Sequence, residues 1–212
     1  MSEITIKQLY EEQTELYEQI IKEKGLEGQD LLPSTVLALQ VELAELANEW
    51  RVFKYWSNDR EPRTQVRCVR CEGEGWRYEY VCKYLGPVEK IKTHCGHCGG
   101  KGYIKQPLLE EYADCLSFFL SIARQIGLSA DKVEPIYQEE IDPKLSTVKL
   151  ISITISKVTE IPETHYWSKE NFLESYSLFR ELGARFGLTW DQIAEAYMKK
   201  NKINYERLAN GY

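Results

Sequence analysis

The chain has 212 residues, of which 43% are apolar and 28% charged, with only 13 glycines and 7 prolines; this composition is typical of a globular protein with one main core and excludes a disordered or fibrous chain. No apolar run is long enough to cross a membrane, and charged residues interrupt the first twenty positions, so we expect a cytoplasmic protein without a signal peptide or membrane contact. The net charge of −6 argues against a surface that binds a phosphate backbone over its whole extent.

Two helices are predicted before residue 58. Apolar residues at helical spacing indicate the first over residues 4–24, with Gln13 inside its apolar stripe. A second helix, over about 36–53, is apolar around most of its circumference and is therefore expected to be buried. Ser34 or Thr35 has the residue type that opens a helix.

The stretch from residue 58 to 107 has a different character. It loses helical periodicity, gains Gly, Tyr and paired Cys, and carries ten Lys and Arg against six Asp and Glu, which leaves a net charge of −10 on the rest of the chain. We therefore predict an inserted module at 58–107 and one catalytic domain built from 1–57 and 108–212.

The remainder again favours helices. The segment 145–161 fits both strand and helix spacing, and we predict a helix. Thr189 and Gln192 form a capping-box pattern at the start of the last helix. The expected helices are 107–127, 145–161, 168–186 and 189–209. The predicted fold class is thus all-α, a bundle of about six helices with a small metal-bound insert.

Carboxylates recur on the apolar second helix. Glu42, Glu45 and Glu49 lie at i, i+3 and i+7, so they project within about 60° of one another. Like charges among apolar neighbours repel one another and lose hydration unless a cation compensates them. A divalent metal ion is the natural compensator.

The next predicted helix repeats this arrangement with Glu111 and Asp114 at i, i+3, and with Glu110 one turn from Asp114. Two such helices packed antiparallel would gather four or five carboxylates, a ligand set that suits Mg²⁺ or Mn²⁺. The alternative is that the acids line a solvated seam or pair with cations. Arg51, Lys54 and Arg124 are the cations available for that pairing.

A carboxylate-held Mg²⁺ site without His ligands most often handles phosphate groups. The last helix supplies complementary side chains, because Lys200, Asn201, Asn204 and Arg207 fall within about 120° of arc. Two cations and two amides on one face suit phosphate oxygens and a sugar or base. The alternative is an ordinary solvated basic face.

Three separated motifs, in this order, resemble the dimeric all-α dUTPase family, which belongs to the all-α nucleoside triphosphate pyrophosphohydrolases together with MazG-type enzymes. The motifs are VELAELANEWRVFKYWS at 41–57, LEEYAD at 109–114 and KNKINYER at 200–207, followed by Gly211 and Tyr212. The resemblance covers the chain except for the insert.

The resemblance implies a homodimer that hydrolyses dUTP, and also dUDP, with two or three Mg²⁺ ions per site. It implies that Glu42, Glu45, Glu111 and Asp114 are the metal ligands. It further implies that Gln13, Lys54, Trp56, Lys200, Asn201, Asn204 and Arg207 bind the nucleotide. One ion is expected to activate a water molecule, whose proton Glu45 or Glu49 accepts.

Gln13 allows a sharper expectation. An unpaired amide on an apolar stripe costs about 1–3 kcal/mol, so it needs a partner. A uracil edge could supply both the donor and the acceptor that a carboxamide requires. The alternative is a core Gln bonded to the backbone or to another helix.

The chain also departs from the family pattern. Sixty-five residues separate Glu45 from Glu111, where the family has a short connection. Leu208 stands where a Gln is expected, and Asn210 replaces an acidic residue. These differences concern the details of substrate contact rather than the metal ligands.

The insert contains one half-motif twice, Cys-x-x-Cys-x-Gly-x-Gly-aromatic, and resembles the zinc-binding repeat of DnaJ-type chaperones. Two such turns complete a tetrahedral site for one structural Zn²⁺, held by Cys68, Cys71, Cys95 and Cys98. His94 and His97 are possible substitute ligands. We expect Cys82 and Cys115 to be ordinary packed thiols.

The role of this module is open. Cations interleaved with aromatic residues can bind nucleic acid, but we favour a clamp that shapes one wall of the active site or the dimer contact. The leading prediction for the protein is a dUTP pyrophosphohydrolase. The alternatives are a pyrophosphohydrolase for another nucleotide such as dCTP, or a nucleic-acid-binding or protein-binding factor whose helical body is a degenerate scaffold.

Overall fold

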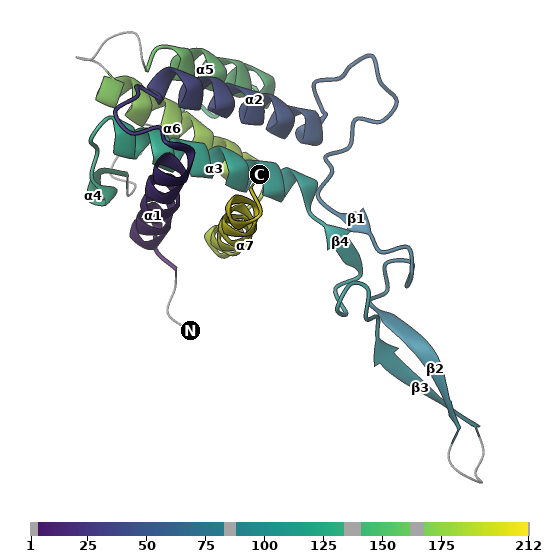
Figure 1. Cartoon of the computed structure of the whole chain (residues 1–212). Helices are drawn as coiled ribbons and strands as arrows, with labels where there is room; N and C mark the ends of the chain where they lie inside the picture. Colours follow the sequence, from purple (N-terminus) through teal and green to yellow (C-terminus); the bar gives the residue numbers. More distant parts are fainter. Residues whose placement is uncertain (1–3, 83–87, 134–140, 162–167, 212) are drawn as a thin grey trace.

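A computed structural model of the protein describes residues 4–82, 88–133, 141–161 and 168–211. In this part of the chain, helices form a bundle, and short strands form a thin extension that projects from one end of it (Figure 1). The helices are α1 (Ile6–Lys24), α2 (Leu32–Trp50), α3 (Pro107–Gln125), α4 (Ala130–Val133), α5 (Thr147–Thr159), α6 (Ser168–Arg185) and α7 (Trp190–Ala209). The strands are β1 (Val66–Arg67), β2 (Trp76–Cys82), β3 (Val88–His94) and β4 (Tyr103–Lys105).

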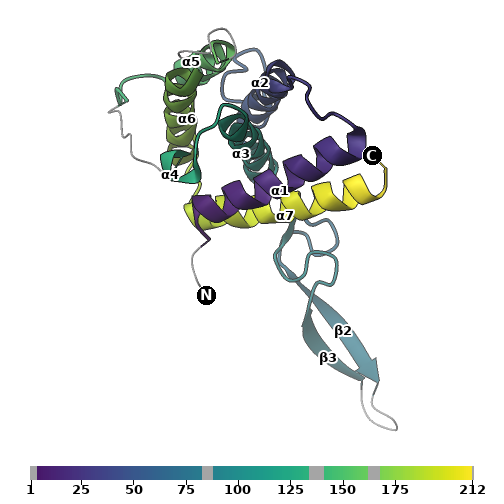
Figure 2. The ribbon, with the colours of Figure 1, turned by 60° about the vertical axis from the view of Figure 1, so that its left-hand side comes forward.

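The all-α prediction is confirmed, with the short helix α4 in addition to the six expected. Helix α3 is the centre of the bundle and packs against α1, α2, α6 and α7. Helices α1 and α7 lie side by side across it, and α5 packs against both α2 and α6 (Figure 2). No helix among the described residues is long and apolar enough to span a membrane.

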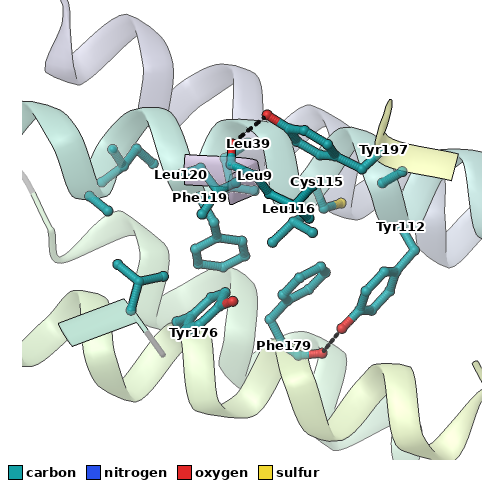
Figure 3. Close-up of a cluster of buried hydrophobic side chains, with 14 of the residues drawn as sticks. Leu9, Leu39, Tyr112, Cys115, Leu116, Phe119, Leu120, Tyr176, Phe179 and Tyr197 are labelled. Atoms are coloured by element: carbon teal, nitrogen blue, oxygen red, sulfur yellow. Dashed lines mark hydrogen bonds between the residues drawn. The ribbon is translucent and has the colours of Figure 1, made fainter. Parts of the chain in front are cut away.

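Aromatic rings fill the space between α3 and α6 (Figure 3). The ring of Phe119 lies 5.9 Å from Phe172, 5.4 Å from Tyr176 and 4.8 Å from Phe179, measured between centroids. Tyr112 stacks on Phe179 at 4.2 Å and donates its hydroxyl to the Phe179 carbonyl. Because α3 is buried on nearly every side, polar residues on its first turns are held close to this core.

The ends of several helices follow local capping chemistry. The predicted capping box at Thr189 is present, and Thr5 forms another with Gln8 at the start of α1. The ambiguous segment is a helix, because the Ser146 side chain accepts a hydrogen bond from the Lys149 amide at its start. The helix predicted there is thus confirmed as α5.

The predicted bounds of the second helix are wrong at both ends. It begins at Leu32, four residues before the expected start, and Leu31 caps it without a side-chain hydrogen bond, so neither Ser34 nor Thr35 opens it. It ends at Trp50 rather than at residue 53, because Arg51 adopts a left-handed backbone with φ of 61°. Few side chains adopt that conformation without a compensating interaction, and Arg51 pairs with Asp59 at 3.0 Å.

The insert leaves and rejoins the bundle at one place. The Arg63 amide donates to the Glu49 carbonyl at the end of α2, and the Arg63 carbonyl accepts from the Leu108 amide at the start of α3. Beyond this junction, β1 pairs with β4, and β2 pairs with β3 farther out, both antiparallel. The extension therefore consists of two β-ribbons that follow one another along its length, with the cysteine turns between them (Figure 1).

Candidate metal and nucleotide site

Three of the predicted carboxylates meet between α2 and α3. These helices run antiparallel (Figure 1), so the acidic turn of one faces that of the other. Oxygen atoms of Glu42, Glu111 and Asp114 all lie within 4.8 Å of one another. The i, i+3 spacing seen in the sequence thus produces a cluster of three acids contributed by two helices.

The cluster is electrostatically strained. Burial, followed by the charges of Asp114, Glu42 and Glu45, raises the pKa of Glu111 to about 7. Burial and the charges of Asp114 and Glu45 also raise the pKa of Glu42, which shares a hydrogen bond with Glu111. Burial likewise raises the pKa of Asp114, against the opposing effect of Lys200. Each of these carboxyl groups therefore has a higher pKa than a free carboxyl group.

This strain and spacing fit a divalent cation. Mg²⁺ takes oxygen ligands at about 2.0–2.1 Å, so oxygens on opposite sides of one ion lie about 4.2 Å apart. The three carboxylates are gathered within nearly that span, and a cation would compensate the charges that now repel one another. Glu45 lies outside this close group and is exposed, although its charge reaches both Glu42 and Glu111.

In the structure, Lys200 partly compensates the acids. Its Nζ lies 2.5 Å from Oδ2 of Asp114, which links α7 to α3. The cations proposed as alternative partners are engaged elsewhere: Arg51 pairs with Asp59 and Arg124 pairs with Glu18. The geometry therefore does not support the alternative in which these two arginines neutralise the acidic motifs.

Glu49 lies one turn beyond Glu45, at the end of α2. Its Oε1 is 3.6 Å from the Arg63 guanidinium, while its buried Oε2 has no hydrogen-bond partner within the described residues. The two carboxylates predicted as proton acceptors therefore differ, since Glu45 is exposed beside the acid cluster and Glu49 is paired at the junction with the insert.

A cavity of about 760 Å³ opens beside the cluster, between α3, α7 and the insert. Glu111 and Asp114 line one side of it, with Lys200 and Arg207 on α7. The insert supplies the remaining wall through His97, Cys98, Lys101, Tyr103, Ile104 and Lys105. Acidic metal-ligand candidates and cations thus share one hollow with the cysteine module.

The other predicted nucleotide-binding residues lie outside this cavity. Asn201 is buried, and its Nδ2 has no partner in the described part of the chain. Asn204 is half-buried on the same helix. Lys54 lies over the ring of Phe53, and Trp56 is 66% exposed in the segment after α2. A single chain does not bring these last two to the acids.

Gln13 is satisfied within the protein. Its Oε1 accepts from the Tyr197 hydroxyl at 2.7 Å, and its Nε2 donates to Ser121 Oγ at 3.0 Å. The side chain is 8% exposed. The amide therefore has the core partners of the alternative interpretation, and the need for an external base edge disappears. Contact with a base remains an untested prediction.

The four paired cysteines form one cluster. The Sγ atoms of Cys68 and Cys95 are 3.9 Å apart, those of Cys71 and Cys98 are 3.7 Å apart, and all four lie within 4.8 Å. A tetrahedral zinc with Zn–S bonds of 2.3 Å requires sulfurs about 3.8 Å apart, whereas a disulfide requires about 2.05 Å. The cluster fits zinc without a histidine.

The two cysteine turns complete each other. Cys68 donates its amide to the Gly102 carbonyl, and Cys95 donates its amide to the Gly75 carbonyl, both at 2.8 Å. The Gly75 and Gly102 amides donate to the sulfurs of Cys71 and Cys98. A Cβ at either glycine would lie 2.2–2.3 Å from the opposite turn, so only glycine fits there.

The remaining cysteine and histidine predictions have mixed outcomes. Cys115 is fully buried on α3, and burial raises the pKa of its thiol well above its usual range, as expected for a packed thiol. The side chain of Cys82 lies outside the described residues. His94 packs edge-on against Trp76 at 4.2 Å, and His97 lines the cavity.

Sequence reasoning missed the cations that the insert brings to the cavity. Lys101 and Lys105 lie near the second cysteine pair, and Lys199 precedes the predicted Lys200. A signal was available for the first two, because they lie just before α3, whose first turns carry Glu111 and Asp114. However, both lysines are far from α7 in the sequence, so the residue pattern alone could not predict that they would line a cavity with that helix.

One comparison with known proteins gives a match. A family model described as dUTPase matches residues 5–70 and 101–212, which leaves out most of the cysteine module. A search of curated proteins finds no match. The matched ranges include both acidic helices and α7.

Proposed function

Because the chain belongs to the dimeric all-α dUTPase family, whose activity is hydrolysis of dUTP, we propose that it converts dUTP to dUMP and pyrophosphate with Mg²⁺. We further propose that it converts dUDP to dUMP and phosphate. The observation that carries this proposal is the cluster of Glu42, Glu111 and Asp114 beside a cavity that also presents Lys200 and Arg207. Carboxylates that gather cations and basic groups that attract phosphate are the two requirements of metal-assisted phosphoanhydride hydrolysis.

In this proposal, the three clustered acids hold Mg²⁺, and Glu45 completes the set. Bound Mg²⁺ neutralises phosphate charge and makes a water molecule a better nucleophile. The raised pKa values of Glu42, Glu111 and Asp114 support this assignment, because burial and nearby carboxylates make the charged forms costly in the absence of a compensating cation. Lys200 holds Asp114 in place and can shift its ammonium group toward a phosphate oxygen.

Glu45 and Glu49 are the candidates for accepting the proton of the attacking water. Glu45 is favoured, because it is exposed beside the acid cluster, whereas Glu49 is paired with Arg63 at the junction with the insert. Glu45→Gln and Glu49→Gln form a matched pair, with the same change one turn apart. Glu45→Gln should lose turnover by about 10²-fold or more whether Glu45 acts as a ligand or as the base, so the Glu49 variant decides: retention of most of the turnover excludes Glu49 as the base, and a comparable loss would contradict the preference for Glu45.

The cysteine module contributes a wall of the site in this proposal. One Zn²⁺, held by the four cysteines, would fix the turn that carries Lys101 and leads to Lys105 on β4. Both lysines line the cavity together with Lys200 and Arg207, so they can add to the positive charge around a triphosphate. The zinc has no open coordination position and is structural.

We also propose that the protein is a homodimer. Large apolar side chains remain exposed on α2 and on the segment after it. They are Leu37, Val41, Val52, Tyr55 and Trp56. A second copy could cover them, as the dimeric family implies. Light scattering of the purified protein measures the mass directly, and a monomer at micromolar concentration would contradict this part of the proposal.

One assay tests the activity itself. Release of pyrophosphate is measured from dUTP, dCTP, dTTP, dATP and UTP, with Mg²⁺ and with a chelator, and release of phosphate is measured from dUDP. We expect rapid Mg²⁺-dependent release from dUTP. A preference for dCTP would support the proposed metal chemistry but would show that the enzyme selects cytosine rather than uracil. No release from any nucleotide, in protein that binds Mg²⁺, would contradict the proposal.

A further inference from the structure

The outer β-ribbon of the insert presents two different faces. In the β2–β3 register, Trp76 pairs with His94, Tyr78 pairs with Lys92, and Tyr80 pairs with Lys90. Paired residues in antiparallel strands point to the same side, and alternate residues share a face. One face is therefore a ladder of three aromatic rings opposite His94, Lys92 and Lys90, and we call it the aromatic-cationic face.

The side chains of this face confirm that arrangement. The Lys90 ammonium lies 4.0 Å from the centroid of the Tyr78 ring, and the Lys92 ammonium lies 5.1 Å from that of Trp76. The rings nevertheless remain accessible, since Trp76 is 39%, Tyr78 is 57% and Tyr80 is 70% exposed. The ribbon projects away from the helical bundle in both views (Figures 1 and 2).

Neither the proposed hydrolysis nor the fold uses these side chains. The cavity is lined by insert residues only from His97 to Gln106, which come after β3. Exposed aromatic residues on a two-stranded ribbon also add little to stability, because they bury little apolar surface. The aromatic-cationic face thus has a composition that catalysis and folding leave unexplained.

We propose that the aromatic-cationic face binds single-stranded nucleic acid. Rings on alternate residues of one strand stand about 6.8 Å apart, which is twice the 3.4 Å rise per nucleotide of a stacked strand. Bases can stack on such rings without regard to sequence, while neighbouring lysines contact phosphates. The insert as a whole carries ten Lys and Arg against six Asp and Glu, so its charge complements a polyanion although the complete chain is acidic.

A single strand suits this face better than the two other polyanions. A duplex hides its bases, so the exposed rings would have no flat partner, and binding would depend on the lysines alone. An acidic polypeptide offers charge but no ring faces for Trp76, Tyr78 and Tyr80. The stacking contribution therefore distinguishes a single strand from a duplex and from an acidic peptide.

The test uses the full-length protein, purified under reducing conditions with zinc present. Fluorescence anisotropy follows binding of a labelled oligothymidine of about 20 nucleotides, of a duplex of equal length, and of labelled polyglutamate, over a series of salt concentrations. Variant Y78A/Y80A removes two rings, and K90Q/K92Q removes two charges. The matched control is R77Q/V81A, because Arg77 and Val81 are exposed on the opposite face of the same ribbon.

We expect the oligothymidine to bind more tightly than the duplex and polyglutamate. Y78A/Y80A should weaken this binding at least about tenfold, as the loss of base stacking predicts. K90Q/K92Q should reduce the slope of log affinity against log salt by about 1.4, or about 0.7 for each lost phosphate contact. R77Q/V81A should bind nearly as the parent does, and all variants should retain parental dUTP hydrolysis.

Three results would each overturn the proposal. The first is the absence of measurable oligothymidine binding at low salt. The second is a loss of affinity in R77Q/V81A as large as that in Y78A/Y80A, because the aromatic-cationic face would then not be the site. The third is equal affinity for polyglutamate and oligothymidine, which would assign the face to an acidic protein. None of these results depends on whether the protein hydrolyses dUTP.

Discussion

The substitution Glu111→Gln should stabilise the metal-free protein. Burial and three neighbouring carboxylates raise the pKa of Glu111 from 4.5 to about 7. This shift corresponds to about 3.4 kcal/mol at 1.36 kcal/mol per unit, and solvent screening of this half-exposed side chain reduces it to about 1 kcal/mol. A neutral amide of the same shape avoids this cost, so the free energy of unfolding should rise by about that amount.

The sign of this effect depends on pH. Above pH 7, Glu111 is charged in both the folded and the unfolded state, and the repulsion is fully present. Between about pH 7 and 4.5 the folded state holds a proton that the unfolded state has lost, so the penalty shrinks as the pH falls. The advantage of Glu111→Gln over the parent should therefore be largest at about pH 8 and smaller at about pH 5.5.

Thermal unfolding in the presence of a chelator measures this prediction. A gain of about 1 kcal/mol corresponds to a rise in Tm of about 2–4 °C for a chain of this size. Glu195→Gln is the control, since Glu195 lines the same cavity but is exposed on α7. A Tm at or below that of the control would refute the electrostatic reasoning. Added Mg²⁺ should raise the Tm of the parent by more than that of Glu111→Gln, because the variant lacks a charged ligand.

The remaining predictions concern the cysteine module and the core amide. Cys71→Ser with Cys98→Ser should abolish the stoichiometric zinc measured in the purified protein, because two of four ligands are lost; zinc retained at one per chain would contradict the site. Lys105→Ala should raise KM for dUTP several-fold with little change in Tm, because it removes a cation from the cavity wall; an unchanged KM would remove β4 from the substrate site. Gln13→Leu should lower the free energy of unfolding by about 1–3 kcal/mol, since it removes two buried hydrogen bonds. If denaturant unfolding shows no loss and selectivity for dUTP over dCTP falls instead, Gln13 reads the base.

Helices were predictable wherever the sequence contained its own capping or stop signals. The capping box at Thr189 appears directly in the residue pattern. Residues 31–35 misled the prediction, because the N-cap residue of α2, Leu31, offers no side-chain hydrogen bond and two favoured cap residues follow inside the first turn. The end of α2 depends on a left-handed Arg51, a residue type that carries no such signal.

The site was predictable to the extent that helical spacing determines it. Glu42, Glu111 and Asp114 meet because α2 and α3 pack antiparallel, as the two acidic motifs suggested. The partners of Gln13 were not predictable, because they come from α3 and α7. Hydrophobic periodicity within each helix does not determine how three helices are rotated relative to one another. The same limit applies to Lys105, whose position depends on the path of the insert.

The junction at Arg63 has a consequence for how the chain tolerates changes in length. Because one residue hydrogen-bonds to both the end of α2 and the start of α3, the excursion between these helices begins and ends at nearly the same point. The entropy cost of closing such a loop grows only with the logarithm of its length. The bundle should therefore accept a turn of a few residues or another folded unit at this position, and a deletion protein that joins the two helices directly should still fold cooperatively.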